Sequence, residues 1–79
     1  MKVKYVGFGG YGTEYPCYED ENGKLYFDIN HGRNELRLYS GAYKDDYGDI
    51  CGEPNTSITE DVECDNPFIK DMTAKVEKE

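Results

Sequence analysis

The sequence predicts a small α+β domain: an antiparallel sheet of about five strands, in hairpin or meander order, with one C-terminal helix. Three observations support this prediction. Clusters of Gly, Asn, Asp and Pro recur at intervals of about 8–12 residues, which is typical of short strands joined by tight turns. Apolar and polar residues alternate between these clusters, and a helical period replaces the alternation only near the C-terminus. Residues 1–79 suffice for a single domain, and an all-β fold is the alternative.

The first half of the chain is expected to begin with strands joined by turns. Val3 and Tyr5 alternate with lysines in the first strand, and a glycine-rich bend follows it. Pro16 favours an edge position for the second strand, because proline cannot donate a ladder hydrogen bond. Asn22-Gly23 then predicts a two-residue hairpin turn, in which both residues need φ > 0. The expected strands here are residues 2–8, 13–18 and 24–29.

The clearest alternation lies on either side of a turn over residues 30–34. Facing side chains of this kind predict a hairpin between residues 24–29 and 35–39. Tyr26 and Tyr39 fall on the face opposite the apolar one, where they are candidates for contact with a partner. The expected core consists of Leu25, Phe27, Ile29, Leu36 and Leu38.

The second half of the chain is less regular. Residues 41–49 are polar and rich in turn formers, and residues 50–51 are expected to form a short strand. Residues 57–64 alternate again, although Glu60 interrupts their apolar face.

The last segment predicts a helix over residues 67–77. Asn66 is a favourable N-cap, and Pro67 suits the first helical position. A further strand through Phe68 and Ile69 is the competing interpretation. The side chains at helical spacing are Phe68, Ile69, Met72 and Val76.

Composition excludes several classes of function. Nine Lys and Arg against 17 Asp and Glu give a formal net charge of −8, which offers no basic footprint for phosphate backbones or anionic lipids. No apolar run approaches the roughly 18 residues of a membrane-spanning helix. Three cysteines are a poor disulfide framework and fit a reducing compartment. We therefore expect a cytoplasmic protein that binds neither nucleic acid directly nor a membrane.

One motif matches a cofactor site in letters only. Residues 7–12 fit the G-x-G-x-x-G pattern of dinucleotide sites. That mechanism needs a helix opening at the last glycine, whereas strand and turn residues follow here. The acidic residues 19–21 would also repel a pyrophosphate. A bend between strands explains the pattern better.

Metal binding and catalysis have little support. The Cys and His residues lack the paired spacing of zinc modules, and residues 45–49 lack the glycine and glutamate positions of a calcium-binding loop. A small metalloprotein or enzyme that uses Cys51, Cys64 and His31 is therefore a minor alternative. We expect no cofactor and no catalysis.

Charge and tyrosine content are the remaining signals. Residues 45–65 contain eight acids and no Lys or Arg, while the rest of the chain is balanced, with nine of each sign. Eight tyrosines could supply contact area at low entropic cost. The candidate partner-binding surface is Tyr26, Tyr39, Asp45, Asp46, Asp49, Asp61, Glu63 and Asp65.

These features predict a non-catalytic, acidic protein-binding domain whose partner is a protein with a basic surface. In size, acidity and β-rich pattern the chain resembles small proteins of phages and mobile elements that block nucleic-acid enzymes by imitating DNA. That resemblance implies a narrower alternative, in which the acids of residues 45–65 imitate a row of phosphates. A subunit that is stable only within an oligomer is a further, minor alternative.

Overall fold

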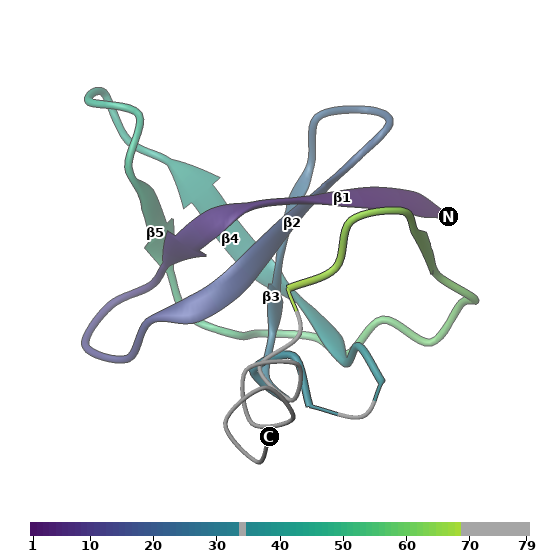
Figure 1. Ribbon diagram of the computed structural model, residues 1–79. Coiled ribbons are helices and arrows are strands. Elements are labelled where there is room, and N and C mark those ends of the chain that lie inside the picture. The colour runs from purple at the N-terminus through teal and green to yellow at the C-terminus, as the bar shows by residue number, and fades with distance from the viewer. Residues whose placement is uncertain (34, 69–79) are drawn as a thin grey trace, which may run out of the picture.

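The computed structural model describes residues 1–33 and 35–68, which form a single mixed sheet of six strands (Figure 1). The order across the sheet is β5-β4-β3-β2-β1-β6. Neighbouring strands are antiparallel except β1 and β6, which are parallel. The strands are β1 (Lys2–Gly9), β2 (Tyr15–Asp20), β3 (Leu25–Asp28), β4 (Leu38–Lys44), β5 (Ile50–Gly52) and β6 (Glu63–Cys64).

The expected α+β class is wrong, because the described residues contain strands and no helix, and their sheet is mixed rather than antiparallel. Residues 69–77 of the predicted helix 67–77 lie outside the described residues. Its expected first residues, Pro67 and Phe68, have no regular structure. The Phe68 N–H donates instead to the Tyr18 hydroxyl at 2.7 Å. This segment is therefore held against the sheet by a long-range contact.

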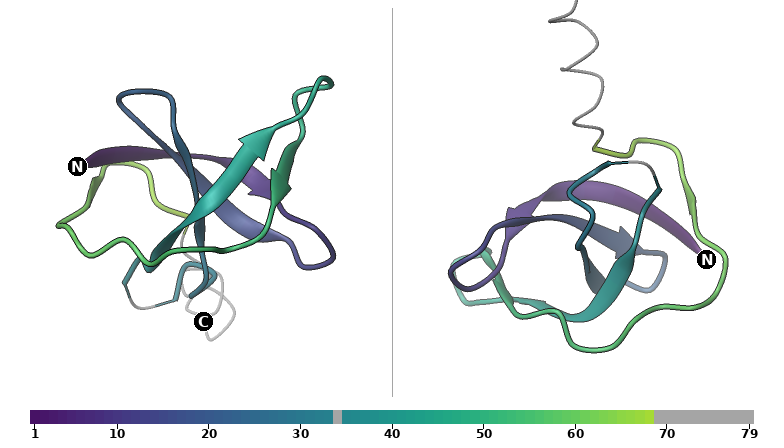
Figure 2. Two further views of the ribbon diagram at one scale, coloured as in Figure 1. Left: turned by 180° about the vertical axis from the view of Figure 1, so that it is seen from behind. Right: turned by 90° about the horizontal axis from the view of Figure 1, so that it is seen from below.

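The sheet curves strongly, so that the end of β1 meets β5 at the opposite edge (Figure 2). The N–H groups of Gly10 and Tyr11 each donate a 3.0 Å hydrogen bond to a carbonyl of β5. A Cβ atom on Gly9 would overlap Ile50. The glycine-rich bend is therefore required for a close approach of two backbones.

The chain between β5 and β6 covers the remaining edge of β4. The N–H of Ile58 donates to the Leu38 carbonyl at 2.9 Å, and Tyr39 and Ser57 form an isolated bridge. The expected strand 57–64 is thus limited to this bridge and the two residues of β6.

Buried side chains lie on both faces of the sheet. Tyr18 and Tyr26 are cross-strand partners and pack with Val3 and Leu38 in one cluster. The pair Cys17 and Phe27 is fully buried on the other face.

The expected core is therefore wrong in part. Phe27 pairs with Tyr39, so Leu38 shares the face of Tyr26 rather than that of Phe27. Leu36 is only half-buried against the cluster, and Ile29 is half-buried. Tyrosine supplies much of the burial that the Leu and Phe positions were expected to provide.

Asp28 explains the shifted strand. Its fully buried carboxylate accepts N–H groups from Asn30 at 3.0 Å, Gly32 at 2.8 Å and Arg37 at 3.0 Å. These bonds hold a wide loop in place of the expected turn over residues 30–34. Strand β4 consequently begins at Leu38 and runs through residues expected to be turns.

Candidate functional site

The acids of residues 45–65 divide between two distant parts of the molecule. Strands β5 and β6 are the opposite ends of the sheet order, and two views place the β4–β5 turn far from β6 (Figures 1 and 2). The predicted acidic surface is therefore two separate groups. The first group is Asp45, Asp46 and Asp49, and the second is Asp61, Glu63 and Asp65.

The β4–β5 turn is built around Asp45. Its Oδ1 accepts N–H groups from Tyr47 and Asp49, each at 2.9 Å. The backbone closes the same turn, from the Asp45 N–H to the Asp49 carbonyl at 2.9 Å and from the Gly48 N–H to the Asp45 carbonyl at 3.1 Å. The N–H groups that bind the Asp45 carboxylate lower its pKa, chiefly the N–H of Asp49. This carboxylate is thus committed to the turn.

The β2–β3 turn has the same construction. Oδ1 of Asp20 accepts N–H groups from Asn22 and Lys24 at 2.9 Å. The two backbone bonds recur at 2.9 and 3.1 Å, between Asp20 and Lys24 and between Gly23 and Asp20. Only Gly23 has positive φ, so the expected turn with two positive φ angles is wrong. The geometry is that of a three-residue loop ending in a left-handed glycine.

The two turns share the residues that form them and differ at the others. Asp and Gly recur at equivalent positions, and both turns place a side chain of the following strand against Oδ2 of the aspartate: Tyr26 at 2.9 Å and Cys51 at 3.6 Å. Tyr47 and Asp49 stand where the first turn has Asn22 and Lys24. The β4–β5 turn therefore uses the backbone N–H groups of Tyr47 and Asp49 but does not require their side chains.

The tyrosines predicted to face a partner are not the most exposed ones. Tyr26 is only 4% exposed, and its hydroxyl donates to Asp20. Tyr39 is half-buried beside Ser57.

Three other tyrosines are exposed around the β4–β5 hairpin and form what we term the tyrosine surface. Tyr11 is 56% exposed, Tyr43 48% and Tyr47 90%. The Tyr11 and Tyr43 hydroxyls hydrogen-bond to each other, which raises the pKa of Tyr43 to about 12. The Tyr43 ring therefore stays neutral at physiological pH.

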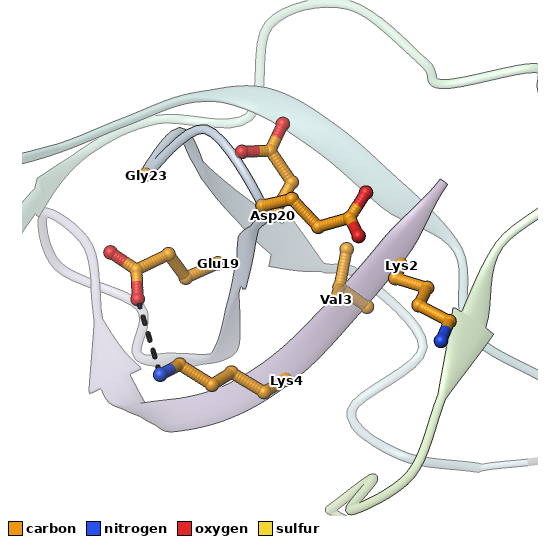
Figure 3. Close-up of a pocket in the computed structure, with 7 residues that line it drawn as sticks. Lys2, Val3, Lys4, Glu19, Asp20 and Gly23 are labelled. Carbon is orange, nitrogen blue, oxygen red and sulfur yellow. Dashed lines mark ion pairs between the residues drawn. The ribbon is translucent and has the colours of Figure 1, made fainter.

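A depression lies elsewhere, between β1 and the β2–β3 turn (Figure 3). It is open and about 430 Å³ in volume. Lys4 forms a 3.9 Å ion pair with Glu19 within it, while Lys2 extends toward β6. Asp20 is already bonded within its turn. The lining of the depression mixes two lysines with three acids, so it has no uniform charge that would favour one class of ligand.

The residues of the minor enzyme alternative lie apart in the fold. Cys51 is beside Asp45, Cys64 is on β6 with its thiol 3.8 Å from Asn66 Oδ1, and His31 stacks on Tyr15 with centroids 5.0 Å apart. Within residues 1–33 and 35–68 no group of three His, Cys, Asp or Glu residues could hold a metal ion.

Comparison with known proteins finds no matching family model, no matching curated protein and no matching solved structure. Over the described part of the chain, no helix has the length and apolarity needed to cross a bilayer.

The sequence reasoning missed the pairing of Tyr11 with Tyr43. These residues are 32 positions apart, and only the curvature of the sheet brings them together. A local signal for the hairpin did exist: D-x-x-G occurs at residues 20–23 and again at 45–48, with Asn in one copy and Tyr in the other.

Proposed function

We propose that this chain is a non-catalytic protein-binding domain and that the tyrosine surface is its contact site. The observation that carries the proposal is Tyr47, whose side chain is 90% exposed at the tip of a turn that does not need it. Burying an aromatic ring removes a large apolar area from water at little entropic cost, and tyrosine is enriched in binding sites for this reason.

The shape and bonding of the hairpin support this role. The β4–β5 hairpin projects from the body of the molecule (Figure 1). Asp45 fixes its turn through two side-chain bonds, and the Tyr11–Tyr43 hydroxyl contact ties its base to the bend after β1. A preorganised projection loses less entropy on binding than a mobile loop.

DNA mimicry is less well supported. A mimic needs carboxylates spaced along one face, whereas the acids of residues 45–65 divide between the two ends of the strand order. We therefore propose a protein contact centred on aromatic side chains, with charge in a secondary role.

Site-specific photo-crosslinking in cells that express the full chain tests the proposal. A benzophenone amino acid replaces Tyr47 in one version and Asn22 in the other, so that the probe occupies equivalent positions of two similar turns. We expect a discrete crosslinked protein from position 47 and none from position 22. Equal crosslinking from both positions, or none from position 47, would overturn the proposal.

A further inference from the structure

We infer that the partner presents an arginine side chain to the tyrosine surface, and this inference rests on the proposed function. The β4–β5 hairpin carries two exposed rings, Tyr43 and Tyr47, and two exposed acids, Asp46 and Asp49, and a guanidinium group can contact both kinds of side chain. The occupant is thus an arginine-bearing protein segment, chosen by charge complementarity with the hairpin.

The β2–β3 hairpin already contains such an arrangement within one chain. Lys24 Nζ lies 5.6 Å from the centre of the Tyr26 ring, and the Tyr26 hydroxyl bonds to Asp20. A cation, a tyrosine and a carboxylate thus lie together beside the first turn.

The β4–β5 hairpin places these groups differently: Cys51 stands where the first hairpin has Tyr26, and its own cation, Lys44, lies at the end of β4. Asp49 occupies the position equivalent to Lys24 and follows the turn glycine, whereas Asp46 and Tyr47 precede it, and all three are exposed. Across residues 1–33 and 35–68, neither Asp46 nor Asp49 takes part in an ion pair. The tip of this turn therefore combines an exposed aromatic ring with two acids free of ion pairs among the described residues, and a partner's cation is complementary to both.

Arginine fits this surface better than lysine. Its planar guanidinium stacks on an aromatic face and can also bond a carboxylate with two parallel N–H groups. Lysine offers a compact, strongly hydrated charge, which makes only one of these contacts at a time.

Titration of the isotope-labelled full chain with two capped peptides, (Gly-Arg)₄ and (Gly-Lys)₄, tests the inference by NMR. We expect amide shift changes concentrated at residues 43–51, and binding of the arginine peptide about two- to fivefold tighter than that of the lysine peptide. Tyr47→Asn should weaken the binding of the arginine peptide by a similar factor. This substitution introduces the residue of the equivalent turn, so the turn should persist.

A matched pair of double variants separates local from general attraction. Asp46→Asn with Asp49→Asn removes two charges at the hairpin, and Glu63→Gln with Asp65→Asn removes two near the opposite edge. At 0.15 M salt we expect the first pair to weaken the affinity for the arginine peptide at least about threefold. The second pair should change it little, because the Debye length is about 8 Å. Equal losses, or shift changes centred on β6, would contradict the inference.

The two proposals fail in different ways. A crosslink from position 47 without preference for the arginine peptide means that the surface binds a partner by other chemistry, and only this inference falls. Failure of the crosslink removes the proposed function, and the inference with it.

Discussion

Three aspartates, each at or just beyond the end of a strand, use their carboxylates to hold the loop that follows. Asp20 and Asp45 each bind two backbone N–H groups in matching turns, and buried Asp28 binds three in a wider loop. Some of the acidity that marks this chain is thus structural, so acidic composition alone overstates the charge available to a partner.

The first prediction concerns the charge of Asp45. Its pKa is lowered in the folded state, so it stabilises the fold above the unfolded pKa of about 3.9 and loses that contribution as pH falls through the lowered value. Asp45→Asn should therefore lower the urea midpoint at pH 7, and the difference from wild type should vanish in strong acid. A difference that persists unchanged at pH 2 would show that charge is not the cause.

The second prediction concerns Gly41. It has φ of 112°, and a Cβ there would overlap the Glu53 carbonyl. Gly41→Ala should reduce the free energy of unfolding by about 2–4 kcal/mol, from strain and overlap together. The control is Gly12→Ala, where φ is 75° and the space is open. It should cost only about 1 kcal/mol in urea denaturation, and equal costs would argue against the close approach.

The third prediction concerns Tyr18, which is fully buried and accepts the Phe68 N–H. Burial raises its pKa to about 12, and burial likewise raises the pKa of Tyr26 to about 12. Unfolded tyrosines lose their protons near pH 10. The contribution of these two buried tyrosines to the free energy of unfolding should therefore be fully present below pH 10 and fall between about pH 10 and 12.

Tyr18→Phe tests this account. It should cost about 1 kcal/mol at pH 7, because the Phe68 N–H loses its acceptor. It should also make the alkaline loss of stability shallower than in wild type. Urea denaturation at pH 7 and pH 11 measures both effects, and an identical alkaline loss in the variant would count against the buried phenol.

At the scale of elements, the strands nearest the N-terminus were the most predictable. Residues 2–8, 13–18 and 24–29 match β1, β2 and β3 to within about two residues, because alternation and turn residues are local signals. Strand β4 was misplaced because the Asp28–Arg37 bond spans nine positions.

The positions of the acids relative to one another in the fold could not be predicted from local sequence patterns either. Composition located the acidic segment correctly along the chain. Its division between two edges depends on the parallel pairing of β6 with β1, which joins residues 61 positions apart. The same limit applies to the Tyr11–Tyr43 contact, whereas the repeated D-x-x-G pattern was visible in the sequence.

The fourth prediction belongs to this scale. Asp46→Glu, Tyr47→Asn and Asp49→Lys give the β4–β5 turn the residues of the β2–β3 turn. Because the backbone bonds of the two turns match, this exchange variant should keep wild-type stability within about 0.5 kcal/mol. Thermal unfolding followed by circular dichroism checks it, and a large loss would mean that Tyr47 or Asp49 supports the fold.

At the scale of the whole molecule, the net charge of −8 does not define a single surface. One group of acids lies on the projecting hairpin that also carries exposed tyrosines, and the other lies near β6 at the far edge. Long-range attraction would draw a basic partner to either group. The aromatic rings distinguish them, because they add contact area that salt does not screen.

The most direct test of this account is the affinity of the exchange variant for the protein that crosslinks from position 47. Wild type and variant share the fold and differ only at the tip of one turn. The account predicts at least about a tenfold loss of affinity, since an exposed aromatic anchor is removed and the Asp49 carboxylate is replaced by a cation. A variant that binds this partner as tightly as wild type would contradict it.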